Sequence, residues 1–207
     1  MRVIIFSWEF PPRRIGQLAD YVMDLATQLV KNEVETYVVT CHDYYTGQSE
    51  EPEGVKTCRV TNPVRTHSGV LTWVLTLNQE VERAAANIYY DADKRVSLTD
   101  VHDWHFIPAA VTLKNAFNLP FIYSVESLED HRSHNADSSF NMAIKSIEHL
   151  GMSEAERIVV KSEWMRDEVV KVFNVPSDKA KVILPDSARW IEGILETYQE
   201  VVEGVVE

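Results

Sequence analysis

Cysteine is scarce in this sequence, which excludes two kinds of small protein. Only Cys41 and Cys58 occur among 207 residues. They have neither the spacing of a zinc knuckle nor the density of a secreted disulfide scaffold. Each lies near the end of a predicted strand, so we expect two reduced thiols in the core. Histidines and carboxylates show no standard zinc spacing either, and we predict no metal and no bound cofactor.

Long apolar runs and an excess of basic charge are also absent. No run approaches the roughly 20 apolar residues of a membrane span. The opening MRVIIFSWEF is too short and too quickly charged for a signal peptide. We therefore expect a cytoplasmic protein without a membrane partner. The formal net charge of -12, from 32 acidic and 20 basic residues, repels phosphate backbones, so we expect no nucleic acid partner.

Short apolar runs alternate regularly with helical patterns along the chain. Most of the apolar runs would be buried on both faces, as in a parallel sheet. The pattern therefore predicts an α/β fold with a doubly wound, mostly parallel sheet and helices on both faces. The predicted strands are 2–7, 34–40, 54–61, 98–104, 120–125, 157–162 and 181–184, and the predicted helices are about 18–29, 70–90, 106–118, 138–150 and 163–173.

Two polar stretches and the tail depart from this alternation. Residues 42–53 are predicted to form a solvated loop, and residues 127–139 a longer loop of the kind that is usually functional or mobile. Residues 188–205 predict a docking helix that needs a surface. We expect residues 1–207, this helix included, to form one domain. The apolar stripe of the helix consists of Ile191, Ile194, Tyr198, Val201 and Val205.

The segment SWEFPPRRIGQLADYV, residues 7–22, leads from the first strand into the first helix. In an open α/β sheet this edge binds ligands. Gly16 allows close backbone approach, and free amides at a helix start attract anions. Arg14 adds positive charge that suits a small anionic ligand. A simple tight turn also explains a single glycine, and Gln17 alone adds nothing, so both interpretations stay open.

Polar residues follow two later strands that end at the same edge. His102 and Asp103 lie in VHDWH, residues 101–105, where Asp103 is also placed to cap the next helix. Carboxylates beside histidines suit acid and base catalysis or a divalent metal. Capping, core packing and a self-paired solvated loop are the structural alternatives. A second group crowds into nine positions: Glu126, Glu129, Asp130, His131, Arg132 and His134.

Four segments resemble, in order and spacing, the N-terminal half of retaining glycosyltransferases of the glycogen synthase-like type. They are residues 2–32, 100–115, 120–133 and 155–183, so the resemblance covers essentially residues 1–184. Such enzymes are two-domain GT-B proteins, and each half is a doubly wound, Rossmann-like α/β domain. The resemblance implies that this chain is similar to the acceptor platform. It also implies that the closing helix is similar to the one that crosses back onto the N-terminal half in the full enzymes.

The resemblance implies a partly kept substrate site with two altered positions. Gln17 stands where the family usually has a second glycine, and its side chain would intrude on donor or acceptor space. Glu126 stands where relatives have a histidine that hydrogen-bonds the transferring sugar, and a carboxylate would repel the donor diphosphate unless protonated. The catalytic residue therefore stays unknown. The implied substrate-binding residues are Arg14, Gly16, Gln17, His102, Asp103, Trp104, Glu129, Arg132 and Ser162.

Three functions remain after this comparison of the residues. The leading one is a relative of the acceptor half of a glycogen synthase-like glycosyltransferase, without full transferase activity alone. The second is a half-enzyme that a partner chain with the donor domain completes, or that acts as a homodimer. The third is a carbohydrate-binding or regulatory module. A glucan or sugar acceptor is the expected small partner.

Overall fold

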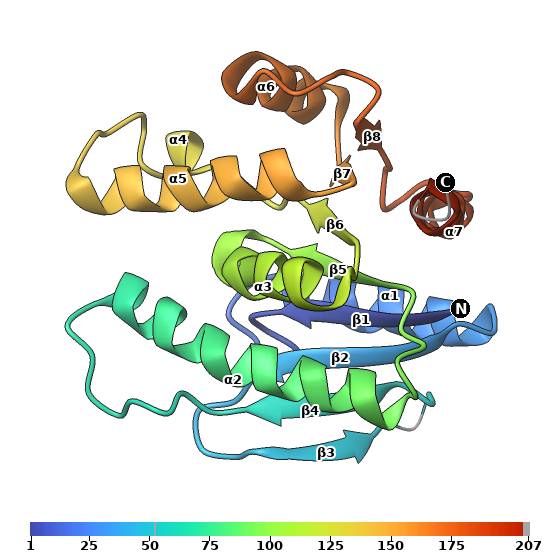
Figure 1. The fold of residues 1–207 in the computed structure, drawn as a ribbon. Coiled ribbons are helices and arrows are strands. Elements are labelled where there is room, and N and C mark those ends of the chain that lie inside the picture. Colours follow the sequence, from blue (N-terminus) through green and yellow to red (C-terminus); the bar gives the residue numbers. More distant parts are fainter. Residues whose placement is uncertain (52, 205–207) are drawn as a thin grey trace.

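The computed structural model describes residues 1–51 and 53–204, and within these ranges eight strands form one sheet (Figure 1). The strand order is β3-β4-β2-β1-β5-β6-β7-β8. All neighbours are parallel except β3, which pairs antiparallel with β4 at the edge. The strands are β1 (Arg2–Ser7), β2 (Glu35–Cys41), β3 (Gly47–Glu50), β4 (Lys56–Val60), β5 (Leu98–His102), β6 (Phe121–Ser124), β7 (Arg157–Val160) and β8 (Ala180–Val182).

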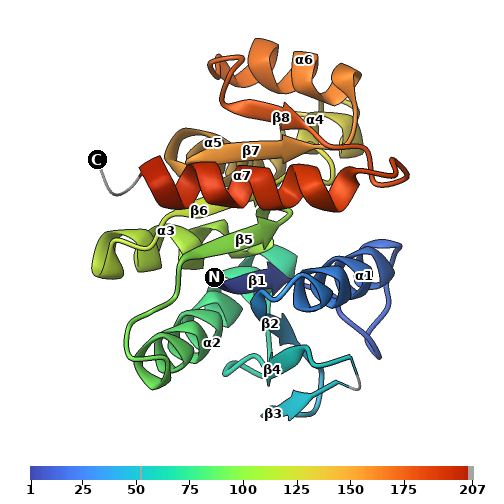
Figure 2. The same cartoon turned by 90° about the vertical axis from the view of Figure 1, so that its right-hand side faces the viewer.

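Helices cover both faces of this sheet, as the sequence predicted. Side chains of α2, α3, α5 and α6 pack into the core on one face, and those of α1 and α7 pack into the core on the other. Figure 1 shows α2, α3 and α5 on the first face, and Figure 2 shows α7 with α1 on the second. The helices are α1 (Leu18–Lys31), α2 (Val70–Asp91), α3 (Ile107–Phe117), α4 (Glu129–Arg132), α5 (Ser139–Glu154), α6 (Glu163–Phe173) and α7 (Trp190–Gly204), and Trp104–Phe106 forms a 3₁₀ turn.

Helix α7 is the docking helix that the tail predicted. Ile194, Tyr198 and Val201 are buried among strand residues of the second face, while Ile191 is partly buried against it. The helix lies across that face beside α1 (Figure 2). Val205 of the predicted stripe lies outside the described residues. The surface that the amphipathic tail required is therefore the sheet of the same chain.

The sheet brings the predicted site segments to one edge. The chain leaves β1 toward β2 on one side and later returns to β5 on the other, so β1 and β5 flank the switch point where open α/β sheets bind ligands. Ser7, His102 and Ser124 stand in register across β1, β5 and β6. Loops 8–17, 103–106 and 125–128 follow these three strands. The site candidates therefore share the carboxyl edge.

Two predicted loops contain short elements that the sequence pattern did not indicate. Residues 42–53 include β3, whose residues Gly47–Glu50 have no apolar alternation. Arg59 fixes this edge strand by donating from Nη1 to Ser49 Oγ at 2.7 Å and from Nη2 to Glu51 Oε1 at 2.9 Å. Residues 127–139 include α4, one turn from Glu129 to Arg132. Tertiary hydrogen bonds rather than local periodicity specify both elements.

The remaining composition-based expectations can be compared with the structure directly. Cys41 and Cys58 are free and buried, and burial raises the pKa of the Cys41 thiol to about 12. Within the ranges that the structure covers, no helix has both the length and the apolar character needed to cross a membrane.

Candidate functional site

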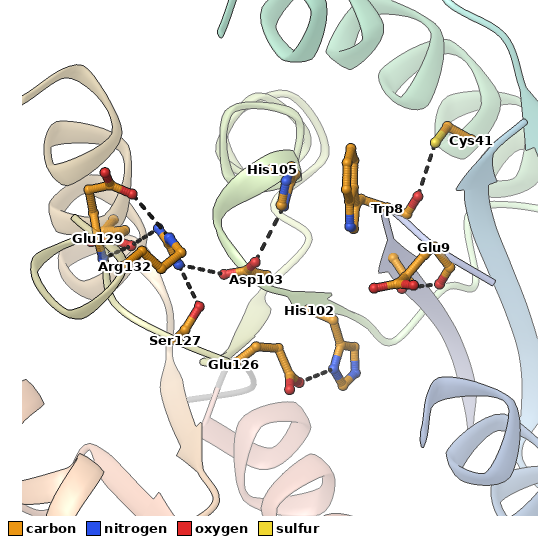
Figure 3. A network of polar contacts seen from close by, with 12 residues as sticks. Trp8, Glu9, Cys41, His102, Asp103, His105, Glu126, Ser127, Glu129 and Arg132 are labelled. Atoms are coloured by element: carbon orange, nitrogen blue, oxygen red, sulfur yellow. Dashed lines mark hydrogen bonds and ion pairs between the residues drawn. The ribbon is translucent and has the colours of Figure 1, made fainter. Parts of the chain in front are cut away.

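The loop after β1 is closed by a carboxylate of its own. Glu9 is 4% exposed, and its Oε2 accepts hydrogen bonds from the amides of Ile15 at 2.6 Å and Gly16 at 2.8 Å. Gly16 is the residue at which the sequence predicted close approach of a ligand, whereas α1 itself starts at Leu18. A bound phosphate would have to displace Glu9, and a Cβ at residue 16 would lie 3.4 Å from Glu9 Oε1. Figure 3 shows Glu9 beside Trp8 at this edge.

The two arginines of this loop have different surroundings. Arg14 is exposed and pairs with Asp20 of α1, with 2.8 Å between Nε and Oδ1. Gln17 is exposed and starts α1 without a side-chain capping bond. Arg13 is the more ordered arginine: its Nη1 donates to the Trp8 carbonyl at 2.8 Å and its guanidinium lies 4.6 Å from the Trp8 ring centroid. No pattern in the sequence distinguishes Arg13 from Arg14.

His102 lies between two carboxylates at the end of β5. The imidazole is 0% exposed, with Nδ1 3.2 Å from Glu126 Oε1 and Nε2 3.5 Å from Asp100 Oδ2. Lys161, which follows β7, forms an ion pair with the other oxygen of Glu126. Figure 3 shows the contact between His102 and Glu126. These four side chains form a charge network whose residues come from β5 and from the segments after β6 and β7.

The network fixes the charge of its members. Burial alone would lower the pKa of His102, but the charges and hydrogen bonds of Asp100 and Glu126 raise it to about 9. Burial would raise the pKa of Glu126, but His102 and Lys161 hold it below its ordinary value. The pKa of Asp100 is also below its ordinary value, because the charge and hydrogen bond of His102 outweigh the effect of burial. At neutral pH the network therefore holds an imidazolium between two carboxylates.

Two tyrosines, Tyr198 of α7 and Tyr21 of α1, extend the network to these helices. Tyr198 of α7 donates to Asp100 Oδ2 at 2.6 Å, and Ser124 donates to Asp100 Oδ1 at 2.7 Å. Lys161 Nζ lies 3.6 Å from the ring centroid of Tyr21 in α1. Because Tyr198 is buried, α7 contributes directly to the hydrogen bonding behind His102.

Arg132 organises a second cluster beside the first. Its guanidinium donates to Ser127 Oγ at 2.6 Å, to Glu129 Oε2 at 3.0 Å and to Glu148 Oε1 at 2.7 Å. Asp103 Oδ1 lies 3.7 Å from Arg132 Nη1 (Figure 3). Several carboxylates therefore share one guanidinium, so Arg132 is already paired within the chain.

Asp103 does not cap the following turn, contrary to the prediction. Its side chain makes no capping bond and faces Arg132 and His105, 3.5 Å from His105 Nδ1. Its backbone has φ 66° and ψ 176°, a region that residues other than glycine rarely adopt and that neighbours must stabilise. Burial raises the pKa of Asp103 to about 6, and burial likewise raises that of Glu148 to about 7.

Trp104 and Ser162 have structural surroundings. Trp104 is 4% exposed and packs with Val74 and Ile144. Ser162 caps α6 by accepting a hydrogen bond from the Met165 amide at 3.1 Å. His105 lies between two indoles, 4.3 Å from the ring centroids of both Trp8 and Trp104, and burial lowers its pKa to about 3. Core packing and capping therefore account for these side chains.

Metal ligation is the remaining chemistry that the acidic residues suggested. Among residues 1–51 and 53–204, no group of three or more histidine, cysteine or carboxylate side chains is arranged to hold a metal ion. His131 instead pairs with Glu168 at 3.5 Å and packs against Trp164.

Comparison with known proteins identifies the family. Residues 17–186 match the model of the glycosyl transferase 4-like domain. The chain belongs to this family. It is 32% identical over 202 residues to an uncharacterized glycosyltransferase of Methanocaldococcus jannaschii, covering 97% of this chain and 50% of the relative. It is 23% identical over 205 residues to the glycogen synthase of Mycobacterium tuberculosis, covering 92% and 50%. The chain thus spans about half the length of these curated relatives.

Solved structures show the same fold at lower identity. A sucrose-phosphate synthase from Thermosynechococcus elongatus has a TM-score of 0.70 at 16% identity, over 88% of this chain and 47% of that one. The catalytic domain of starch synthase IV from Arabidopsis thaliana, bound to ADP and acarbose, has a TM-score of 0.61 at 12% identity, over 88% and 51%. These neighbours are GT-B glycosyltransferases, and the α/β fold of this chain matches about half of each of them.

This glycosyl transferase 4-like domain brings together four of the nine substrate-binding residues implied by the resemblance, together with Glu126. His102 and Glu126 share one network, and Asp103, Glu129 and Arg132 share the next. Arg14 pairs with Asp20 apart from both, and Trp104 and Ser162 serve packing and capping.

The sequence did not indicate three partners of these clusters, Asp100, Glu148 and Lys161, nor Glu9, which closes the loop after β1. One signal was available, because Asp100 and His102 stand two apart in a strand and therefore face the same side. No local pattern pointed to Glu148, which reaches Arg132 from α5.

Proposed function

We propose that this domain is the acceptor-side domain of a glycogen synthase-like glycosyltransferase and does not transfer sugar by itself. The observation that carries the proposal is the pairing of its site cations. His102, Arg132 and Lys161 each contact carboxylates of the same chain. A nucleotide diphosphate would have to compete with those carboxylates and with Glu9. Its binding energy must therefore come from another domain.

The position of α7 supports treating residues 1–207 as one domain that includes the helix at about 188–205. The chain passes from β8 through residues 183–189 into α7, and α7 packs on the same sheet. A second sucrose-phosphate synthase chain from Thermosynechococcus elongatus covers 98% of this chain and 98% of itself, with a TM-score of 0.69 at 13% identity. A solved chain of this extent with the same fold supports treating residues 1–207 as one domain.

Exposed apolar side chains support a partner for the carboxyl edge. Ile15, Tyr44 and Leu184 are 60%, 92% and 49% exposed, and they lie in loops after β1, β2 and β8. Apolar groups on loops of one edge favour a covering surface. A donor domain, in the same polypeptide or in a partner chain, is the occupant that the resemblance implies. The half-enzyme and homodimer remain the second candidates, and a carbohydrate-binding module is the third.

Isothermal titration calorimetry with UDP-glucose, ADP-glucose and GDP-mannose tests the proposal. We expect no saturable binding below the millimolar range, because His102, Arg132 and Lys161 are already paired with carboxylates of the same chain. The full-length Methanocaldococcus jannaschii relative serves as a comparison. Saturable binding in the low micromolar range by this domain alone would overturn the proposal. Binding of a glucan without any nucleotide sugar would instead favour the third candidate.

A further inference from the structure

A separate cavity lies at the β2 and β4 side of the carboxyl edge. Its volume is about 490 Å³, within the range of about 300 to 1,000 Å³ that small-molecule sites occupy. It is formed by the segments after β2 and β4 and by the first turn of α2, away from the network around His102. The lining residues that matter below are His42, Tyr44, Asn62, Arg65, His67 and Trp73.

One wall of this cavity is a supported indole. Trp73 packs edge-on against Trp8 with 5.8 Å between ring centroids, and Trp8 in turn stacks on His105 at 4.3 Å. Asn62 fixes the local backbone by donating to the Trp73 carbonyl at 2.6 Å. The partly exposed indole is therefore held rigidly, and a rigid apolar ring face is the surface on which the C–H face of a sugar ring packs.

Two imidazoles line the cavity beside this wall. His42 Nδ1 accepts from the amides of Tyr44 at 3.2 Å and Tyr45 at 3.1 Å, so Nε2 is the ring nitrogen that can donate to a ligand. The His67 ring lies 6.3 Å from the Trp73 ring between centroids, and its Nε2 is buried. His42 is therefore the imidazole that can hydrogen-bond a ligand in the cavity.

The lining contains one guanidinium, Arg65, and one carboxylate, Asp43. Its carboxylate, Asp43, pairs with Arg13 at 3.5 Å. Arg65 is exposed at the rim, and in the described part of the chain no carboxylate pairs with it within 4.0 Å. A guanidinium without a carboxylate partner is a natural ligand for a carboxylate or phosphate group.

We propose that this cavity binds a saccharide that carries an anionic group, either a carboxylate or a phosphate. Its ring packs on Trp73, a hydroxyl accepts from His42 Nε2, and its anionic group pairs with Arg65. The proposal rests on the proposed function, because it names the chemical class of the acceptor. The anionic group of the acceptor would therefore bind at Arg65, and not at His102 or Arg132, which are already paired with carboxylates.

NMR titration of the intact chain tests this proposal, with the indole N–H signal of Trp73 assigned from Trp73→Phe. The probes are glucose 6-phosphate, glucuronate, unsubstituted glucose and inorganic phosphate. We expect the two anionic sugars to shift the Trp73 signal, and glucose to bind at least about tenfold more weakly. Comparison of the two anionic sugars distinguishes phosphate from carboxylate. Equal binding of glucose, binding of inorganic phosphate as tight as that of glucose 6-phosphate, or no response to either anionic sugar would overturn the proposal.

Matched charge variants isolate Arg65. Arg65→Gln should remove the preference for anionic sugars, whereas Arg95→Gln should keep it, because Arg95 is exposed and paired with Asp93 elsewhere. Retained preference in Arg65→Gln would contradict the assignment. Failure of the proposed function has a different signature, since nucleotide sugars would then bind in calorimetry whether or not Trp73 responds to anionic sugars.

Discussion

His102 shows at the scale of one residue how the site is held. If the imidazole were neutral, the carboxylates of Asp100 and Glu126 would lose the positive charge that lies between them. The folded-state pKa of His102 lies above its ordinary value of 6.5, at about 9. Its stabilising contribution is therefore complete below about pH 6.5 and is lost as the pH rises through about 9. The lowered pKa values of Asp100 and Glu126 act oppositely and remove stability as the pH falls through them.

NMR titration of the His102 ring measures this directly. We expect an imidazole pKa near 9, and a free energy of unfolding that decreases between pH 7 and pH 10 in urea titrations. His102→Asn identifies the signal. Asp100→Asn should move the imidazole pKa down, because it removes the carboxylate that raises this pKa most. A ring that titrates at or below 6.5 would show that the two carboxylates do not hold a proton between them.

Glu126 is kept ionised by its charged neighbours rather than by contact with solvent. Its side chain is 17% exposed and is kept charged by His102 and Lys161. An ionised carboxylate only accepts hydrogen bonds, whereas the histidine that the resemblance implies for this position would donate one to the transferring sugar. Under the proposed function, negative charge at position 126 would also oppose the electrostatic stabilisation of a departing diphosphate.

Helix α7 shows what the sequence could predict about an element. Apolar residues recur along it with the 3.6-residue period of a helix, which predicted one buried face. The burial of Ile194, Tyr198 and Val201 confirmed this prediction. The sequence could not show that Tyr198 reaches Asp100, because that contact joins residues 98 positions apart. The short elements β3 and α4 were missed for the same reason: the partners Arg59 and Arg132 create them through tertiary contacts.

Truncation of a buried side chain in α7 tests how much the docking contributes. Ile194 is 1% exposed, so Ile194→Ala should lower the free energy of unfolding by about 2 to 5 kcal/mol through lost burial and a residual cavity. Gln199→Ala, on the exposed face of the same helix, should change it by less than about 0.5 kcal/mol. Urea midpoints of the two variants give the comparison. Equal midpoints for Ile194→Ala and the unchanged protein would mean that α7 is dispensable for stability.

At the scale of the whole molecule, the alternation of strands and helices predicted the parallel sheet, its two covered faces and the edge that collects the polar residues. Fold prediction succeeded because burial on both faces leaves a continuous apolar signal in each strand. The site was harder, because its side chains bind one another. His102 and Arg132 could be identified from their positions at or beyond the ends of strands. Their ion pairs with Asp100 and Glu148 could not, because those pairs depend on how the elements pack.

A chimaera with a donor domain tests the central claim most directly. The C-terminal half of the Methanocaldococcus jannaschii relative is inserted in place of residues 185–188, so that α7 still follows it. Variants with Glu126 and with Glu126→His are compared, each carrying Gln17→Gly, and the isolated chain and isolated donor half serve as controls. Sugar transfer from a panel of nucleotide sugars to acceptor is measured for all four proteins. The account predicts transfer only in the chimaera with histidine at position 126, and transfer by the isolated chain or equal transfer with Glu126 retained would contradict it.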